Sequence, residues 1–212
     1  MPMSQGPLHL YVDSLFTSPY AMSVFVALRE KGLAFETLTL DLDAGQTQAA
    51  DYAQRSLTQR VPTLVDGDFA LSESSAITEY LDQAYPETRV YPADVQQRAR
   101  ARQVQAWLRS DLLPIRQERS TLVVFCGQKR PPLSAEAQAA ATKLISAAQA
   151  LLADNREYLC GQWSIADVDL AVMLNRLILN GDAMPAQLVA YAQRQWQRPS
   201  VREWVELRRP AL

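Results

Sequence analysis

Apolar residues in the first third of the chain follow two different periods. Residues 8–12 alternate between apolar and other side chains, as do residues 37–42, and each alternation predicts a strand. Between them, residues 20–31 carry apolar side chains at helical spacing, and Gly32 provides a stop signal. A strand, a helix and a second strand in this order predict a βαβ unit with parallel strands and a right-handed crossover.

The same alternation continues through a small α/β domain. Residues 46–55 favour a short helix. Two apolar runs, at 63–65 and 69–71, flank an Asp-Gly pair at positions 66–67, which predicts a β-hairpin. A helix with apolar side chains on one face follows the hairpin. The predicted order is βαβαββα, thioredoxin-like, over a domain of residues 1–86.

The character of the chain changes near residue 85. Tyr-Pro pairs at 85–86 and 91–92 bracket a short polar stretch, which is typical of a linker. Beyond it only helical periods occur, so residues 92–212 are predicted to form an all-helical bundle domain. The predicted helices are Val95–Glu118 with a bend near Pro114, Ser134–Asp154, a buried central helix over Ile165–Ile178, 186–196 and 200–208.

Composition limits the classes of function. The chain has 212 residues and 48% hydrophobic content, which is enough for a buried core. A net charge of −2 gives no attraction to nucleic acid or to an anionic membrane, and no apolar run approaches the roughly 20 residues of a membrane span. Residues 1–7 lack the features of a signal peptide, and two cysteines fit a reducing compartment, so a cytoplasmic location is expected.

Metal chemistry is not expected. His9 is the only histidine and lies between Leu8 and Leu10, so we interpret it as the outward face of a strand. Neither Cys126 nor Cys160 has a CxxC partner or a basic neighbour that would clearly lower its pKa, and both are interpreted as inert thiols.

Ser18-Pro19 stands where the first strand gives way to the first helix. Serine as N-cap followed by proline at the first helical position is an ordinary helix start. The same hydroxyl would also lie at a helix N-terminus beyond the C-terminal end of a strand, where the helix dipole and free N–H groups favour an anion. Ser18 is therefore a predicted cap and also a candidate donor of a hydrogen bond to a bound thiolate.

Two further segments are candidates for a site that binds a small peptide. Pro62 precedes a strand, either as an ordinary trans start or with a cis bond that turns the N–H and C=O of Val61 toward an extended ligand. Glu73-Ser74 precedes a helix. It provides either ordinary helix-start chemistry or an opposite-charge pair, in which Ser74 binds a carboxylate and Glu73 binds an ammonium group.

The helical half adds one structural motif and one pocket hypothesis. Ser164 and Asp167 form a predicted capping box at the start of the apolar helix, which we interpret as structural. Tyr20 and Trp107 either wall an apolar pocket beside the thiolate or belong to the core.

Taken together, these segments resemble the cytosolic glutathione S-transferase family over essentially the whole chain. The resemblance rests on the thioredoxin-like order of the first domain, Arg60-Val61-Pro62-Thr63-Leu64, Asp66-Gly67, Glu73-Ser74-Ser75-Ala76-Ile77, and Gly161 with Ser164-Ile165-Ala166-Asp167. Ser18 matches the catalytic serine of the theta- and zeta-like branches. The resemblance implies a glutathione-binding site formed by Arg60, Val61, Pro62, Glu73 and Ser74.

By the same resemblance, Pro62 would be the cis-proline and Val61 would pair with the cysteinyl backbone of glutathione. Glu73 and Ser74 would hold the γ-glutamyl head, and Arg60 would touch the glycyl end. The helical domain would complete the pocket for the electrophile. The chain departs from the family where Ser56-Leu57 replaces a frequent Asn-Pro, and where Ser18-Pro19-Tyr20 replaces the Ser-Ser-Cys of zeta isomerases. Because position 18 is not cysteine, a mixed-disulfide mechanism is disfavoured.

The resemblance implies a glutathione transferase that uses glutathione as co-substrate, without a metal, and attacks a small electrophile or an organic peroxide. A homodimer is expected, because the family is usually dimeric. Two alternatives remain open: a glutathione-dependent isomerase or dehalogenase, and a non-catalytic binding module with the same fold.

Overall fold

In the computed structural model, which describes residues 7–210, the four predicted strands form one mixed sheet. The sheet order is β2-β1-β3-β4, and the strands are β1 (Leu8–Asp13), β2 (Phe35–Leu40), β3 (Thr63–Asp66) and β4 (Phe69–Ser72). Strands β1 and β2 run parallel, whereas β3 runs antiparallel to both β1 and β4. The predicted parallel pair and the hairpin are therefore confirmed.

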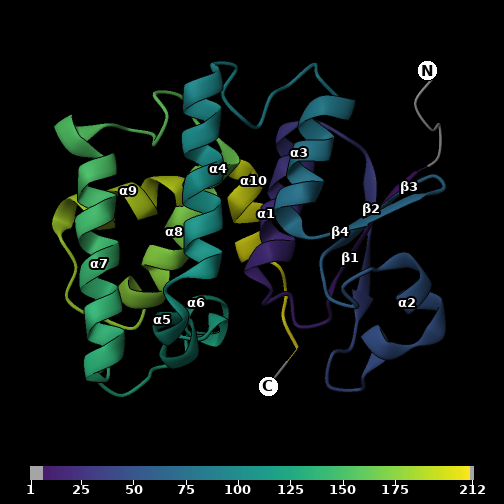
Figure 1. Ribbon diagram of the computed structural model, residues 1–212. Helices are drawn as coiled ribbons and strands as arrows, with labels where there is room; N and C mark the ends of the chain where they lie inside the picture. The colour runs from purple at the N-terminus through teal and green to yellow at the C-terminus, as the bar shows by residue number, and fades with distance from the viewer. Residues whose placement is uncertain (1–6, 211–212) are drawn as a thin grey trace. The chain divides into compact units, whose positions relative to one another are not determined.

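Helices complete the predicted βαβαββα order. They are α1 (Pro19–Glu30), the 3₁₀ turn η1 (Gln46–Gln48), α2 (Ala50–Arg55) and α3 (Ser74–Ala84). Helices α1 and α3 pack side by side against the sheet, and α2 lies on its other side (Figure 1). The alternation in β1 places Leu8, Leu10 and Val12 in the core, where they meet the continuously buried stretch 21–28 of α1. Their common burial is what holds the helix on the sheet.

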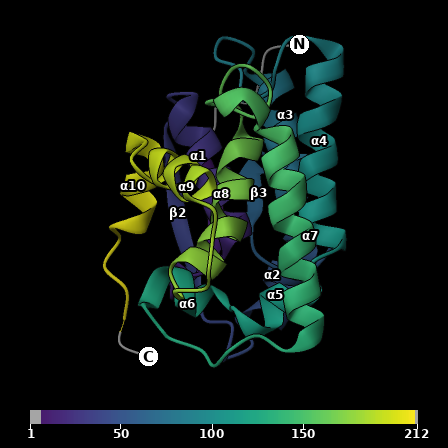
Figure 2. The same ribbon diagram turned by 90° about the vertical axis from the view of Figure 1, so that its left-hand side faces the viewer.

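The chain beyond the linker is all-helical, as predicted. It contains α4 (Val95–Ser110), α5 (Leu113–Glu118), α6 (Thr121–Cys126), α7 (Ala135–Leu151), η2 (Ala153–Asn155), α8 (Ile165–Ile178), α9 (Ala186–Trp196) and α10 (Pro199–Val205). Nearly all residues of α8 are buried, and it packs against α4, α6 and α9 (Figure 2). The sequence predicted this central position because α8 is apolar on nearly every side.

One helix prediction was wrong. The single helix expected over Val95–Glu118 is two helices, and the chain breaks at residues 111–112 instead of bending at Pro114. Asp111, the C-cap of α4, is extended with φ −105° and ψ −169°, which ends the helical path. Leu112 is left-handed with φ 57°, and Pro114 lies in the first turn of α5. A proline in the first turn loses no helical hydrogen bond, so there it starts a helix and does not bend one.

The start of α8 carries the capping box that the sequence predicted. The Asp167 carboxylate accepts hydrogen bonds from the Ser164 N–H at 2.9 Å, the Leu159 N–H at 2.8 Å and the Tyr191 hydroxyl at 2.8 Å. Burial raises the pKa of Asp167, and the backbone hydrogen bonds from Leu159 and Ser164 act in the opposite direction. This buried carboxylate therefore satisfies donors that water cannot reach.

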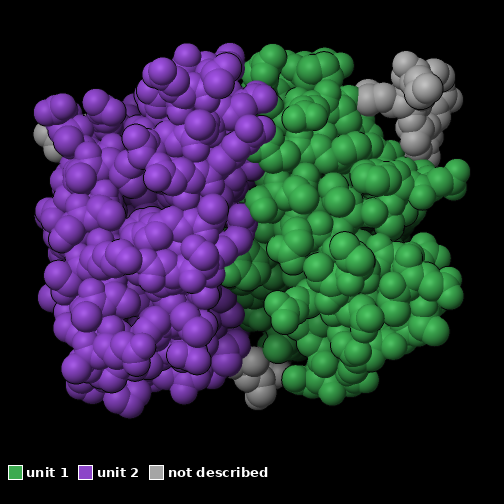
Figure 3. Space-filling model, in the orientation of Figure 1, with its two compact units in different colours: residues 1–90, 203–212 green, residues 91–202 purple. Residues whose placement is uncertain are grey.

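The described chain divides into two compact units (Figure 3). The first comprises Met1–Val90 together with Glu203–Leu212, and the second comprises Tyr91–Arg202. The C-terminal segment, which lies within the predicted helical domain, clusters by its contacts with the first unit. Trp204 is buried against the rings of Phe16 and Phe25, and Glu203 forms an ion pair with Arg29 at 2.6 Å.

Candidate functional site

The C-terminal end of β1 carries a buried carboxylate that organises the following loop. Asp13 is 3% exposed, and its carboxylate accepts the Thr17 N–H at 2.7 Å and the Ser18 N–H at 2.9 Å. It also accepts the Thr17 hydroxyl at 2.9 Å. Hydrogen bonds to an ionised acceptor are about twice as strong as neutral ones, so this carboxylate fixes the backbone that leads into α1.

Ser18 is the N-cap of α1. Its Oγ accepts a hydrogen bond from the Ala21 N–H at 3.2 Å. Because that bond uses an oxygen lone pair, the hydroxyl proton remains available to a ligand. The neighbouring Thr17 differs, since its hydroxyl donates to Asp13. The structure therefore separates two adjacent hydroxyl groups that the sequence alone could not distinguish, because the Thr17 proton is donated to Asp13 and the Ser18 proton is not.

The second segment leads into β3. The sequence left open whether the Val61–Pro62 bond is trans or cis, and the structure has it cis. The carbonyl oxygen of the preceding Arg60 lies 2.8 Å from the Tyr52 hydroxyl and 3.2 Å from the Thr63 hydroxyl. Desolvation by burial raises the pKa of Tyr52, so this hydroxyl stays protonated as a donor. Buried hydroxyl groups of the protein thus hold the backbone that precedes Pro62.

The third segment forms the start of α3. Glu73 is the N-cap, with φ 75° and ψ 111°, a conformation that costs a non-glycine residue about 1–3 kcal/mol. Its side chain is exposed and makes no cap hydrogen bond with the described residues, whereas Ser74 is only 2% exposed. Capping by the Glu73 side chain therefore does not explain this segment. The first N–H groups of α3 and the Ser74 hydroxyl are gathered at one helix end.

The sheet register brings all three segments to one edge. Thr63, directly after Pro62, pairs with Tyr11 of β1 and with Ser72 of β4. The C-terminal end of β1, the start of β3 and the C-terminal end of β4 consequently lie beside one another. Ser18, Val61 and Glu73 follow or precede these strand ends by a few residues. This edge is where open α/β sheets place their ligands.

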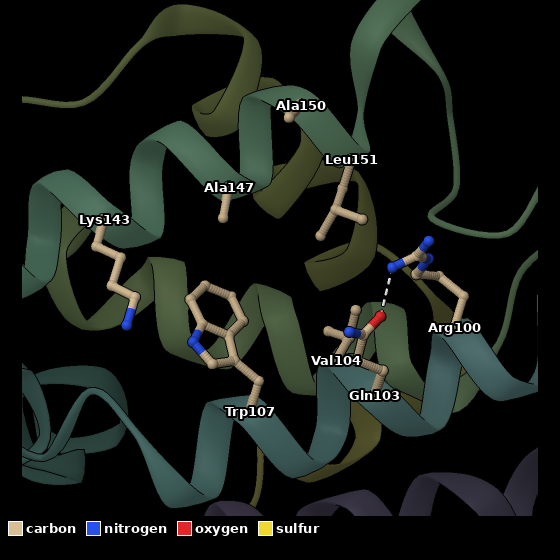
Figure 4. A pocket seen from close by; sticks show the side chains of 8 residues that line it. All are labelled: Arg100, Gln103, Val104, Trp107, Lys143, Ala147, Ala150 and Leu151. Atoms are coloured by element: carbon tan, nitrogen blue, oxygen red, sulfur yellow. Dashed lines mark hydrogen bonds between the residues drawn. The ribbon is translucent and has the colours of Figure 1, made fainter.

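The two aromatic residues predicted to wall a pocket belong to different units. Tyr20 lies half-buried in the first turn of α1. Trp107 lies on α4 in the helical unit, where it lines a cavity of about 440 Å³ facing Lys143, Ala147 and Leu151 of α7 (Figure 4). Their joint role in one pocket stays a prediction.

The indole of Trp107 is oriented by a charged pair. Its Nε1–H donates to Asp111 at 2.9 Å, and Lys143 also donates to the same carboxylate. The hydrogen bond from Lys143 holds the pKa of Asp111 at about 2, so this carboxylate is ionised at physiological pH. The Asp111 carboxylate therefore links the Trp107 indole on α4 to Lys143 on α7.

The cysteines and metal-ligating residues add no second centre. Burial raises the pKa of the Cys160 thiol to about 11, so it is not a nucleophile at neutral pH. Cys126 is a free thiol on α6. Within residues 7–210, no group of three or more His, Cys, Asp or Glu side chains is arranged to hold a metal ion, and no helix is long and apolar enough to cross a membrane.

Sequence reasoning missed the residues whose side chains form hydrogen bonds with the backbone of the site. Asp13 and Tyr52 hold its backbone but carry no motif of their own. The hydrogen bonds of Asp13 reach four and five residues ahead, beyond the two-residue reach of an ordinary aspartate turn, so no standard local signal marks them. For Tyr52 no such signal existed, since its partners come from a different element.

Comparisons with known proteins identify both halves of the chain. Residues 7–83 match the family model described as glutathione S-transferase, N-terminal domain, and residues 94–209 match glutathione S-transferase, C-terminal domain. A solved glutathione transferase homologue from Burkholderia, with bound glutathione, is 46% identical, with a TM-score of 0.77 over 95% of this chain and 97% of that chain.

Curated relatives include theta-class enzymes. Glutathione S-transferase theta-1 of Homo sapiens is 34% identical over 171 residues, which is 76% of this chain and 69% of that protein. Glutathione S-transferase theta-3 of Mus musculus is 37% identical over 130 residues, which is 59% of this chain. The match covers 53% of theta-3, so this chain spans about half the length of that relative.

Replacement of Asp13 by asparagine tests the anchoring of the first loop. The amide has one acceptor oxygen, so the N–H of either Thr17 or Ser18 loses its partner. We expect Asp13→Asn to lower the free energy of unfolding by about 1.5–3 kcal/mol, measured by urea denaturation. The exposed Asp68→Asn serves as control and should change it by less than about 0.5 kcal/mol. Equal stabilities of the two variants would contradict the anchoring role.

Proposed function

This chain belongs to the glutathione S-transferase family, and on that premise we propose that it is a glutathione transferase. It activates the thiol of bound glutathione for attack on an electrophilic carbon or on the oxygen of an organic peroxide. The observation that carries the proposal is the convergence of Ser18, Val61 and Glu73 at one edge of the sheet. Residues 1–86 are proposed as the glutathione-binding domain, and residues 92–212 as the helical domain that completes the electrophile pocket.

Glutathione is proposed to bind in an extended form across that edge. The cis bond before Pro62 supports pairing of the Val61 N–H and C=O with the cysteinyl backbone. The exposed Glu73 carboxylate suits the γ-glutamyl ammonium, and the Ser74 hydroxyl with the α3 N-terminus suits its carboxylate. Arg60 is exposed and is proposed to meet the glycyl carboxylate.

Ser18 is the proposed catalytic residue. Its hydroxyl, free to donate, stabilises the glutathione thiolate together with the N-terminus of α1. A free thiol has a pKa of about 8.5, and a decrease of roughly 2 units, worth about 2.7 kcal/mol, makes it mostly thiolate at neutral pH. The thiol proton goes to solvent, and the sulfur lone pair then forms the new bond while the leaving group departs with its electron pair.

With an organic peroxide, the thiolate attacks one oxygen and the O–O bond breaks. The sulfur is oxidised to a sulfenic acid of glutathione, and the alkoxide takes a proton to become the alcohol. A second glutathione condenses with the sulfenic acid to give glutathione disulfide and water. Conjugation and peroxide reduction therefore need the same thiolate, and an isomerase or dehalogenase would start from it as well.

Replacement of Ser18 by alanine tests the proposed activation. Removal of one preorganised donor typically costs about 10²–10³ in rate, so we expect Ser18→Ala to lose that much turnover with glutathione binding largely retained. The ultraviolet absorbance of the thiolate, followed against pH in the glutathione complex, should show a depressed thiol pKa in the parent protein and a return toward the free value in Ser18→Ala.

Ser14→Ala is the matched control for this experiment. It removes a hydroxyl from the same loop, and should leave the bound thiol pKa unchanged. A parent complex with an unshifted thiol pKa would remove Ser18 as activator, and failure to bind glutathione at millimolar concentration would favour the non-catalytic binding module.

Replacement of Glu73 by glutamine tests recognition of the γ-glutamyl head. Loss of the opposite charge should weaken glutathione binding about tenfold, which corresponds to roughly 1.4 kcal/mol, in isothermal titration. An analogue that lacks the γ-glutamyl amino group should bind the parent more weakly, but should bind Glu73→Gln and the parent alike. The exposed Glu87→Gln is the charge-matched control. An equal loss for Glu73→Gln with both ligands would place the ammonium elsewhere.

The protein is also proposed to be a cytoplasmic homodimer that acts on a small electrophilic or peroxide substrate. Its two unpaired thiols support a reducing compartment, and its family supports the dimer. Sedimentation equilibrium at micromolar concentration should therefore give twice the chain mass of 23.7 kDa. A mass of one chain across the whole concentration range would overturn the dimer and leave the proposed chemistry intact.

A further inference from the structure

The C-terminal segment beyond α10 returns to the loop that precedes Ser18. The Arg209 guanidinium donates to the carbonyl oxygen of Phe16 through Nε at 3.3 Å and through Nη2 at 3.2 Å. The two residues are 193 positions apart in the sequence, and both belong to the first unit. Phe16 lies two residues before Ser18.

The same guanidinium also organises its own segment. Nη1 donates to the carbonyl oxygens of Val205 at 2.8 Å and Leu207 at 3.0 Å, and Nη2 donates to that of Trp204 at 3.0 Å. All five N–H groups of the fork therefore have a backbone acceptor. Only arginine presents five donors in one plane, so lysine cannot reproduce this arrangement.

Phe16 is held in a conformation that needs support. Its φ is 51°, in the left-handed region that a bulky residue rarely adopts. Its N–H donates to the Asp13 carbonyl at 3.0 Å, and its ring packs edge-on against Trp204 at 5.8 Å. The C-terminal segment thus holds both the carbonyl and the ring of Phe16, while Asp13 holds the two residues that follow.

We propose that Arg209 is a positioning residue for the Ser18 hydroxyl, which it reaches through the Phe16 carbonyl. The inference rests on the proposed function, because it assigns Arg209 a role in the activation of glutathione. The loop 14–18 is fixed at one end by the Asp13 carboxylate and in its middle by Arg209. Without the guanidinium, the peptide between Phe16 and Thr17 is held only through its N–H, by the Asp13 carboxylate, and the hydroxyl that follows is positioned less tightly. A displacement of about 1 Å at such a donor can cost up to about 100-fold in rate.

Replacement of Arg209 by glutamine tests the proposal, with Arg208→Gln as the matched control. Arg208 is exposed and adjacent, so its variant removes the same charge from the same segment. We expect Arg209→Gln to lower kcat/KM about tenfold and to raise the pKa of the bound glutathione thiol by about one unit. Its affinity for glutathione should change less than about threefold, since the proposed binding contacts come from other segments.

Two more variants separate positioning from general stability. Arg209→Lys keeps the charge without the planar fork and should lose most of the effect, so it also serves if Arg209→Gln does not fold. In a Ser18→Ala background, Arg209→Gln should produce no further change in the thiol pKa, because its route to the thiolate is already gone. A residue that acted only on folding would lower the melting temperature and leave the thiol pKa where it was.

The outcomes distinguish this inference from the proposed function. A parent complex with an unshifted thiol pKa removes Ser18 as activator, and a parent that fails to bind glutathione overturns the proposed function. A parent with a depressed thiol pKa that Arg209→Gln and Arg208→Gln leave equally unchanged overturns the positioning role alone. An additional pKa change from Arg209→Gln in the Ser18→Ala background would also overturn it.

Discussion

A buried carboxylate at the end of the first strand is the constraint on which the site depends. Asp13 accepts the backbone N–H groups of both Thr17 and Ser18, so the loop has one conformation when α1 begins. Because the Thr17 hydroxyl donates to Asp13, the adjacent Ser18 hydroxyl is the one whose proton is not committed to that carboxylate. A single carboxylate thus holds the backbone of the loop and accepts the Thr17 hydroxyl.

Buried side chains also form hydrogen bonds with main-chain groups at two other places outside regular helices and strands. The Tyr52 hydroxyl and Thr63 support the Arg60 carbonyl before the cis bond, and the Asp167 carboxylate satisfies the start of α8. In each case a buried side chain satisfies main-chain groups that no helix or strand can satisfy. Among the residues proposed to bind glutathione, Arg60 and Glu73 are exposed, whereas Ser74 is buried at the start of α3. The side chains that hold the backbone of the site are therefore different from those proposed to bind glutathione.

The order βαβαββα was predictable because it depends on short-range periodicity. Residues 8–12 alternate and α1 repeats at helical spacing, and each pattern has one stable way to bury its apolar face. The break at Asp111 and Leu112 was not predictable in the same way. Proline is a strong local signal, so the sequence placed the distortion at Pro114, whereas the extended Asp111 and the left-handed Leu112 between the two helices carry no compositional mark. The contacts of the C-terminal segment with the first unit were not predictable either, because periodicity shows that Trp204 is apolar but not which residues cover it.

The sequence by itself determined the elements, their apolar faces, the hairpin turn and the helix caps, since these depend on residues within a few positions of one another. It also identified Ser18, Val61 and Glu73 as candidates, although each had an ordinary structural interpretation. Only the tertiary structure decided that they meet at one sheet edge, through the pairing of Thr63 with both Tyr11 and Ser72. It alone decided which hydroxyl is free and which arginine, 193 positions away, reaches the loop. The physical reason is that hydrogen bonds between distant segments depend on strand register and packing, which leave no periodic trace in the chain.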